Sequence, residues 1–297
     1  MRLAAIDIGS NAARLLITEV ISNNGKPQFN KLNLVRVPLR LGFDVFERNE
    51  ISSEKEEMVL NTIKSYKYLL DVYDVKYLKA CATSAMRDAK NSAAIINRVK
   101  AETGILIEVI SGDTEATLIY ENHVAENMDT DHSYLYIDVG GGSTELTFFA
   151  DGRLVSKKSF NIGTIRLLKG QVEESLWDEM RDFIRTALKG HDQVVAIGSG
   201  GNINKVFSLS KRKEGKPLTL DLLKDYHKEL SNVSIKDRII LYKLREDRAD
   251  VIVPALSIYI NVMRWANAPE IYVPKIGLVD GLVQHLYEEV KLKNIVV

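Results

Sequence analysis

Residues 134–149 read YLYIDVGGGSTELTFF: an apolar, β-favouring run, three glycines, and a second β-favouring run. The pattern predicts a strand, a tight glycine turn and a returning strand. Consecutive glycines let a backbone approach a ligand closely and direct several N–H groups at one anion. Asp138 at the strand end could hold a hard cation such as Mg²⁺ beside a phosphate. An ordinary hairpin with a glycine-rich turn explains the same residues, and this stretch alone does not decide between the two interpretations.

The same pattern occurs a second time near the N-terminus, where residues 3–17 read LAAIDIGSNAARLLI. Asp7 corresponds to Asp138 and Leu15 to Leu146. One copy in each half of the chain predicts two related domains. A third glycine loop, residues 198–201, follows another apolar run. The three loops in this order resemble the actin, heat-shock-70 and sugar-kinase superfamily, in which two domains clamp a phosphate chain between hairpin loops.

The composition fits a globular protein and excludes several classes. The 297 residues include 40 basic and 40 acidic side chains, so no overall basic charge indicates nucleic-acid binding. Cys81 is the single cysteine, which excludes an intrachain disulfide and a cysteine-rich zinc site; we expect it to be a small buried apolar side chain. Asp7 interrupts the first apolar run, so we expect no signal peptide at the N-terminus. The longest apolar stretch, 251–263, is too short to span a bilayer. We expect a cytoplasmic protein.

Strands and helices alternate along the first half of the chain, which predicts an α/β fold. Ser53 and Glu56 match a capping box before a helix of about 18 residues. Apolar spacing predicts that this helix buries the following residues: Met58, Ile63, Leu69 and Leu70.

Two charged residues follow predicted strands in this half. Arg87 comes shortly after the strand predicted over 75–82, at the edge where α/β folds bind ligands, although a surface ion pair would also explain it. Glu115 comes after the strand predicted over 105–110, in the first turn of a helix, where the helix dipole alone would favour a carboxylate. The polar stretch that follows places a domain boundary between residues 122 and 123. We therefore expect domains over 1–122 and 123–297, with the last helix able to pack back on the first.

Motifs along nearly the whole chain resemble one family, the exopolyphosphatases and guanosine pentaphosphate phosphohydrolases. The matching stretches are AAIDIGSNAARLLI at 4–17, ATSAMRDAKN at 82–91, IEVISGDTEATLIY at 107–120, YIDVGGGSTEL at 136–146, NIGTIRLL at 161–168, IGSGGNI at 197–203, DRADVIVPAL at 247–256 and GLVDG at 277–281. The resemblance implies a two-domain actin-like, heat-shock-70-like (ribonuclease H-like) fold with a cleft between the domains. It also implies Mg²⁺-dependent, or other divalent-cation-dependent, hydrolysis of terminal phosphoanhydride bonds, and a homodimer.

Site residues carry over by matching motif positions. Glu115 matches the catalytic glutamate that orients or deprotonates the attacking water. Asp138 matches the metal-associated aspartate, with a catalytic role as well, and Glu145 is a second metal ligand. The phosphate-binding positions are Ser10, Asn11, Arg87, Gly140, Gly141, Gly142 and Ser143. A base, a metal-holding carboxylate, an arginine and backbone N–H groups are the parts that phosphoryl transfer requires.

Three positions depart from the family pattern: Ala12 replaces the family's usual serine, Thr114 replaces a glutamate and Asn202 replaces a threonine. Longer family members continue into helical domains, and this chain ends soon after its last predicted helix. Together with the basic loop Lys211–Lys216, this favours short polyphosphate or guanosine pentaphosphate as substrate and distributive hydrolysis. Two other functions stay open, an ATP-dependent small-molecule kinase of the same fold and a non-catalytic sensor of guanosine tetra- or pentaphosphate.

Overall fold

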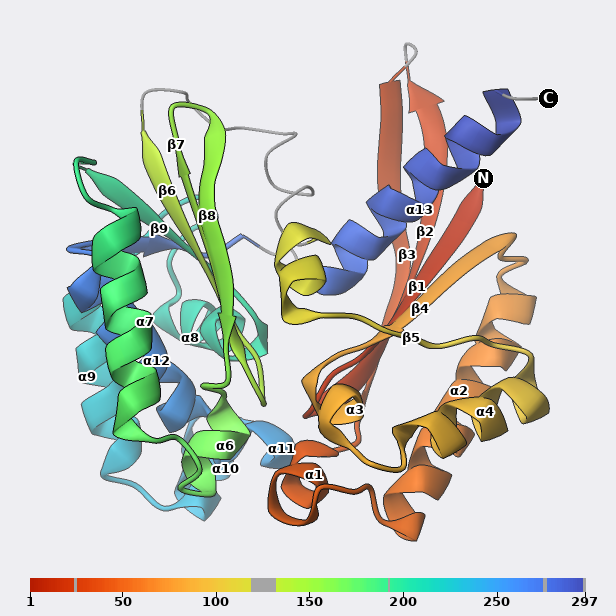
Figure 1. Cartoon of the computed structure of the whole chain (residues 1–297), viewed down its shortest axis with the longest axis horizontal. Coiled ribbons are helices and arrows are strands. Elements are labelled where there is room, and N and C mark those ends of the chain that lie inside the picture. The colour runs from red at the N-terminus through yellow and green to blue at the C-terminus, as the bar shows by residue number, and fades with distance from the viewer. Residues whose placement is uncertain (24–25, 119–131, 192, 275–276, 296–297) are drawn as a thin grey trace. The chain divides into compact units, whose positions relative to one another are not determined.

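The computed structural model describes residues 1–23, 26–118, 132–191, 193–274 and 277–295 (Figure 1). The chain forms two compact units, the first comprising residues 1–122 with 277–297 and the second residues 123–276. The boundary predicted between residues 122 and 123 lies outside the described residues. Among the helices that the structure describes, none has the length and apolar character needed to cross a membrane.

The first unit is built on a five-stranded sheet in the order β3-β2-β1-β4-β5. Strands β1 (Arg2–Ile8), β2 (Ala12–Asn23) and β3 (Lys26–Pro38) form two successive antiparallel hairpins, whereas β4 (Tyr77–Ala82) and β5 (Glu108–Val109) add in parallel. The strand predicted over 105–110 is wrong in extent, because only Glu108 and Val109 pair with β4. Six residues of β1 are buried, so the sheet is covered on both faces.

The helical segments of this unit are α1 (Gly42–Arg48), α2 (Ser53–Val72), α3 (Ser84–Asp88), α4 (Ser92–Thr103), residues 112–118 and α13 (Leu278–Ile295). Helix α13 lies across one face of the sheet, and its Leu282 and Val283 share an apolar cluster with Leu3 and Ala5 of β1 (Figure 1). Ion pairs Lys31–Asp280 (2.6 Å) and Lys79–Glu289 (2.5 Å) reinforce this contact. The last helix of the chain is therefore part of the first unit's core.

Two predictions for α2 are wrong. Its N-cap is Ser52, whose Oγ accepts a hydrogen bond from the Lys55 N–H, so the capping residue stands one position before the predicted Ser53. Met58 is 37% exposed. The buried stripe instead follows Val59, Leu60, Ile63, Tyr66 and Leu70. Because each residue turns a helix by about 100°, a stripe centred on Val59 leaves Met58 at its exposed flank.

The second unit has a six-stranded sheet in the order β10-β11-β9-β6-β7-β8. Its strands are β6 (Ser133–Val139), β7 (Thr144–Ala150), β8 (Arg153–Phe160), β9 (Val194–Ser199), β10 (Leu218–Thr219) and β11 (Glu270–Tyr272). The sequence β8-β7-β6-β9-β11 repeats the β3-β2-β1-β4-β5 order of the first unit. This repetition confirms the duplicated hairpin pattern seen in the sequence.

The helices of the second unit are α6 (Thr164–Leu168), α7 (Glu174–Ala187), α8 (Gly201–Ser210), α9 (Leu220–Ser231), α10 (Ile235–Leu241), α11 (Glu246–Ala249) and α12 (Ile252–Trp265). Helix α12 supplies much of the core, and Ile258, Val262 and Met263 are fully buried. Pro254 lies in its first turn, where a backbone N–H would have no partner within the helix.

Candidate active site

The glycine loop of the second unit, residues 140–143, joins β6 to β7 and is anchored by hydrogen bonds to the start of α6. The carbonyl oxygens of Gly140 and Gly141 accept hydrogen bonds from the N–H groups of Thr164 (3.1 Å) and Ile165 (2.8 Å). The Gly142 carbonyl accepts one from Arg166 Nε (2.8 Å). In a trans peptide the C=O and the following N–H point in opposite directions. The N–H groups of residues 141–143 are therefore directed away from α6, as an anion-binding loop requires.

Gly163 explains why this arrangement is so close. A Cβ at this position would lie 2.4 Å from both the Gly141 carbonyl oxygen and the Gly142 carbonyl carbon. Residue 163 therefore has to be glycine for α6 to reach the loop. No role was predicted for Gly163 or Arg166, although both belong to the motif NIGTIRLL, because their contact with the glycine loop becomes visible only in the fold.

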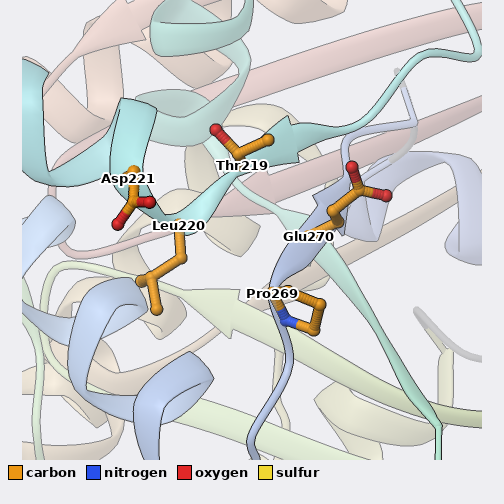
Figure 2. A pocket seen from close by; sticks show the side chains of 5 residues that line it. All are labelled: Thr219, Leu220, Asp221, Pro269 and Glu270. Atoms are coloured by element: carbon orange, nitrogen blue, oxygen red, sulfur yellow. The ribbon is translucent and has the colours of Figure 1, made fainter.

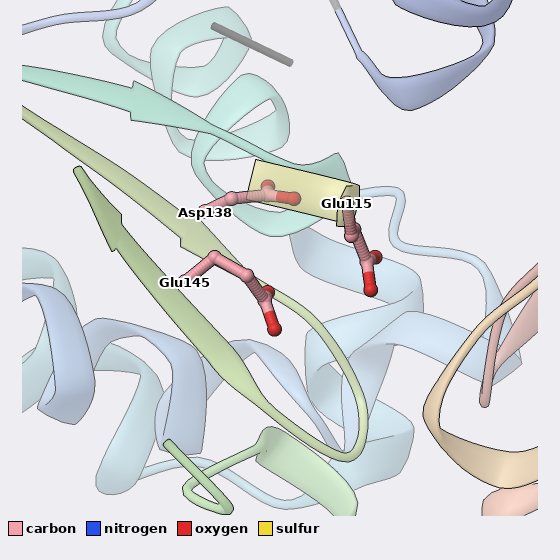
Figure 3. A group of neighbouring side chains, drawn as sticks. All are labelled: Glu115, Asp138 and Glu145. Atoms are coloured by element: carbon pink, nitrogen blue, oxygen red, sulfur yellow. The ribbon is translucent and has the colours of Figure 1, made fainter. Parts of the chain in front are cut away.

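The two candidate metal ligands lie side by side on adjacent strands, with Asp138 of β6 directly opposite Glu145 of β7. Their carboxylate oxygens lie within 4.8 Å of each other (Figure 3). Glu115, also drawn in that figure, belongs to the first unit. Two adjacent carboxylates disfavour each other's charge unless a proton or a cation is shared between them. Carboxylate oxygens are the ligands that Mg²⁺ prefers, so the pair fits such an ion.

Serine hydroxyl groups orient both carboxylates from the neighbouring strands. Ser199 of β9 stands opposite Asp138 and donates a hydrogen bond to its Oδ1 (2.7 Å). Ser159 of β8 stands opposite Glu145 and donates to its Oε1 (2.7 Å). The four side chains form one row across the sheet. Neither serine was predicted as a supporting residue, because their alignment with the carboxylates depends on the strand register.

The third glycine loop packs against this row. Gly200 has φ +115°, and a Cβ there would lie 3.1 Å from the Val139 carbonyl oxygen and 3.3 Å from Asp138 Oδ1. A larger side chain would therefore be strained and would press on the candidate metal ligand. Asn202, which departs from the family pattern, lies one residue into α8 and is partly exposed.

In the first unit the corresponding row has a different charge. Asp7, the counterpart of Asp138, stands opposite Arg14, and Arg14 Nη1 lies 2.6 Å from Asp7 Oδ2. Arg36 of β3 is next in the row, opposite Arg14. Burial raises the pKa of Asp7, and the charge and hydrogen bond of Arg14 oppose that rise. Asp7 is thus neutralised by the protein itself.

The loop after β1 carries the candidate phosphate-binding residues Ser10 and Asn11. Ser10 Oγ lies 2.8 Å from Ser84 Oγ at the start of α3, and both side chains are buried. The Asn11 carbonyl oxygen accepts hydrogen bonds from the N–H groups of Leu39 (3.2 Å) and Arg40 (2.9 Å). Ala12, the first family departure, is buried at the start of β2. The loop is therefore fixed by its neighbours in the first unit.

Arg87 and Glu115 are connected through the chain segment that leads into residues 112–118. Arg87 Nη1 donates to the Ile110 carbonyl oxygen (2.9 Å). Ser111 caps the helix, and its Oγ accepts from the Thr114 N–H (3.1 Å). Thr114 Oγ1 lies 2.9 Å from the same oxygen, so this family departure is part of the cap. Glu115 is 9% exposed, which is unusual for a carboxylate that serves only the helix dipole.

The comparisons with known proteins identify the family. A model of the Ppx/GppA phosphatase family matches residues 20–290. The chain belongs to the Ppx/GppA phosphatase family. Among solved structures, an exopolyphosphatase from Cytophaga hutchinsonii is 26% identical with a TM-score of 0.84, covering 97% of this chain and 98% of that one. A Ppx/GppA family member from Aquifex aeolicus is 27% identical with a TM-score of 0.74, covering 97% and 98%.

Family membership and these solved structures confirm the predicted two-domain actin-like fold. A curated relative, the bifunctional 3-dehydroquinate synthase/phosphatase of Fusobacterium nucleatum, is 37% identical over 172 residues, or 55% of this chain. That alignment spans 25% of the relative's own length.

Cys81 is buried as predicted, and burial raises the pKa of its thiol to about 12.

A shallow depression of about 350 Å³ lies elsewhere in the second unit, at the β10–β11 edge (Figure 2). Its lining residues are Thr219, Leu220, Asp221, Pro269 and Glu270. Asp221 is paired with Lys224 at 2.9 Å. The two carboxylates in this lining would repel a phosphate, so the depression does not suit the substrates of this family.

Proposed function

We propose that this protein is a divalent-cation-dependent phosphohydrolase that releases terminal phosphate from inorganic polyphosphate or guanosine pentaphosphate. One observation carries the proposal: the carboxylates of Asp138 and Glu145 lie within 4.8 Å of each other at the base of a loop whose N–H groups face away from α6. A hard cation and a phosphate are the natural pair of ligands for carboxylates beside such a loop. Membership in a phosphatase family supports the same chemistry.

In this proposal Asp138 and Glu145 hold Mg²⁺, with Ser199 and Ser159 fixing the two carboxylates through their hydrogen bonds. The ion, when bound, neutralises charge on the phosphate oxygens. The N–H groups of Gly141, Gly142 and Ser143 bind the terminal phosphate. These groups are preorganised by α6, so they need no rearrangement as charge develops on the reacting phosphate.

Glu115 is assigned the role of orienting or deprotonating the attacking water, and Ser10, Asn11 and Arg87 the role of contacting substrate phosphates. These assignments are supported by their family motifs. A bond forms from the water oxygen to the terminal phosphorus, the bridging P–O bond breaks, and the water proton passes to Glu115. The products are inorganic phosphate and a substrate shortened by one phosphate.

A phosphate-release screen tests the proposal. The substrates are polyphosphates of several lengths and guanosine pentaphosphate, each with Mg²⁺ and with a chelator. We expect Mg²⁺-dependent release, and we expect Asp138→Asn to raise the Mg²⁺ concentration needed for half-maximal activity. An unchanged Mg²⁺ titration in Asp138→Asn would remove Asp138 from the metal site. Sugar- or acid-dependent ADP formation from ATP would favour a kinase, and binding without release would favour a sensor.

Three finer properties belong to the same proposal: a preference for short polyphosphates or guanosine pentaphosphate, a cytoplasmic location and a homodimer, of which the family resemblance supports the homodimer. The preference for short chains agrees with the basic loop Lys211–Lys216, whose cationic side chains are mostly exposed. Exposed charges contribute little in screened water, so each added phosphate should improve affinity only modestly. Light scattering that gives a monomer mass across micromolar concentrations would refute the homodimer.

A further inference from the structure

A buried tyrosine in the core of the second unit is joined by two hydrogen bonds to a candidate metal ligand. Tyr259 of α12 is 1% exposed, and its hydroxyl donates a hydrogen bond to the carbonyl oxygen of Ser199. The side chain of the same serine donates to Asp138 Oδ1 at 2.7 Å. These two hydrogen bonds, from Tyr259 to Ser199 and from Ser199 to Asp138, therefore link the apolar core to the glycine loops.

The environment of Tyr259 makes its hydroxyl group notable. Its neighbours along α12, Ile258, Val262 and Met263, are all fully buried and apolar. A hydroxyl in such surroundings is costly unless it is hydrogen-bonded, and phenylalanine would fill the same space without that requirement. The tyrosine therefore provides something at this position that packing alone does not need.

The backbone between Ser199 and Gly200 is the place where that hydroxyl acts. Gly200 has φ +115°, and its hypothetical Cβ would lie 3.3 Å from Asp138 Oδ1 and 3.4 Å from the Tyr259 hydroxyl. The Tyr259 hydroxyl and the Asp138 carboxylate therefore both lie close to Gly200. Because glycine has no side chain to restrict this peptide, a hydrogen bond to the Ser199 carbonyl is an effective way to fix its orientation.

We propose that Tyr259 is a positioning residue for Asp138, acting through Ser199. By holding the Ser199 carbonyl it sets the direction of the Ser199 side chain, and that side chain sets the orientation of the Asp138 carboxylate. Such outer hydrogen bonds commonly determine how well a ligand binds its metal. The proposal rests on the proposed function, in which Asp138 holds a divalent cation.

The test measures Mn²⁺ binding to the full chain by electron paramagnetic resonance, without substrate, together with thermal unfolding. Tyr259→Phe keeps the ring and removes the hydroxyl, and we expect it to weaken Mn²⁺ binding by about 10- to 100-fold. Ser199→Ala should weaken binding by a similar factor. The double variant should be no weaker than the worse single variant, because both changes break one chain of hydrogen bonds.

Tyr66→Phe is the matched control. Tyr66 is also 1% exposed, and its hydroxyl donates to a backbone carbonyl, that of Ala13, in the first unit. We expect Tyr66→Phe to lower the unfolding temperature and to leave Mn²⁺ affinity unchanged. If Tyr259→Phe behaves in the same way, its hydrogen bond is only structural and the inference is wrong.

The wild type and Asp138→Asn separate the inference from the proposed function. Mn²⁺ binding that is lost in Asp138→Asn but unaffected in Tyr259→Phe overturns the inference alone. A wild type that binds no Mn²⁺ overturns both, since no metal ligand would remain to be positioned. If Tyr259→Phe does not fold, the Mn²⁺ affinity of Ser199→Ala tests the same series of hydrogen bonds. Wild-type Mn²⁺ affinity in Ser199→Ala contradicts the inference that this series positions Asp138.

Discussion

Gly163→Ala is the sharpest single test of how the glycine loop is held. The backbone of Gly163, at φ −134° and ψ 163°, is one that alanine adopts without strain, so any effect comes from the added methyl group. That methyl would lie 2.4 Å from the Gly141 carbonyl oxygen, whereas ordinary contact begins at 3.4 Å. The loop or α6 must therefore move by about 1.0 Å, which is the difference between these distances.

The size of the effect follows from that displacement. Overpacking of this kind costs about 1–3 kcal/mol of stability. A misplacement of about 1 Å at a reacting group can cost on the order of 10²-fold in rate. We therefore expect Gly163→Ala to fold with reduced stability and to lose about 10²-fold in kcat for phosphate release. The measurements are urea unfolding and steady-state kinetics on the same preparation.

Gly170→Ala is the control, because Gly170 has φ +65° and open space around its Cβ position. Alanine there costs about 1–2 kcal/mol through its left-handed backbone without touching the loop. We expect comparable destabilisation in the two variants and a loss of turnover only in Gly163→Ala. Wild-type kcat in Gly163→Ala, or an equal loss in Gly170→Ala, would refute the reasoning.

Three further predictions concern the base, the product pattern and pH. Glu115→Gln should lower kcat by about 10²–10⁴-fold with KM nearly unchanged, and near-wild-type turnover would exclude the assigned role. A time course on long polyphosphate should give a ladder of intermediates that shorten together; direct loss of full-length chains to end product would show processive action instead. Burial alone would raise the pKa of Asp44, but hydrogen bonds from Lys55 and Ser52 lower it to about 2. A carboxyl group whose pKa is lower in the folded protein than in the unfolded chain stabilises the folded protein at pH values above its unfolded pKa. Asp44→Asn should therefore cost about 2 kcal/mol of stability at neutral pH. That cost should shrink as pH falls from about 4 to 2, and denaturation that shows no such trend would contradict the assignment.

The sequence predicted those features that depend on neighbours along the chain. The pattern Asp-x-Gly after an apolar segment located both hairpins, and its duplication is enough to match Asp7 with Asp138. The sequence also placed Glu115 in the first turn of a helix, and residues 112–118 form that helix, with Ser111 Oγ accepting the Thr114 N–H.

Features that depend on distant contacts could not be predicted in this way. Ser159 and Ser199 become partners of the carboxylates only because the strands that carry them align in one register. Gly163 belongs to the motif NIGTIRLL, but only the fold shows that it lies against the glycine loop. Local patterns also misplaced a boundary, since Ser52 and Ser53 are chemically identical and only backbone geometry decides which one caps α2.

The duplication explains why one half of the chain suits a metal ion and the other does not. In the first unit Asp7 faces Arg14, and the pair is neutral. In the second unit Glu145 takes the position of that arginine and faces Asp138 at no more than 4.8 Å. With an effective dielectric constant of about 20, two negative charges at that separation repel by roughly 3 kcal/mol. A divalent cation turns this repulsion into attraction, so a change from arginine to glutamate at one strand position converts a neutral ion pair into a candidate metal site.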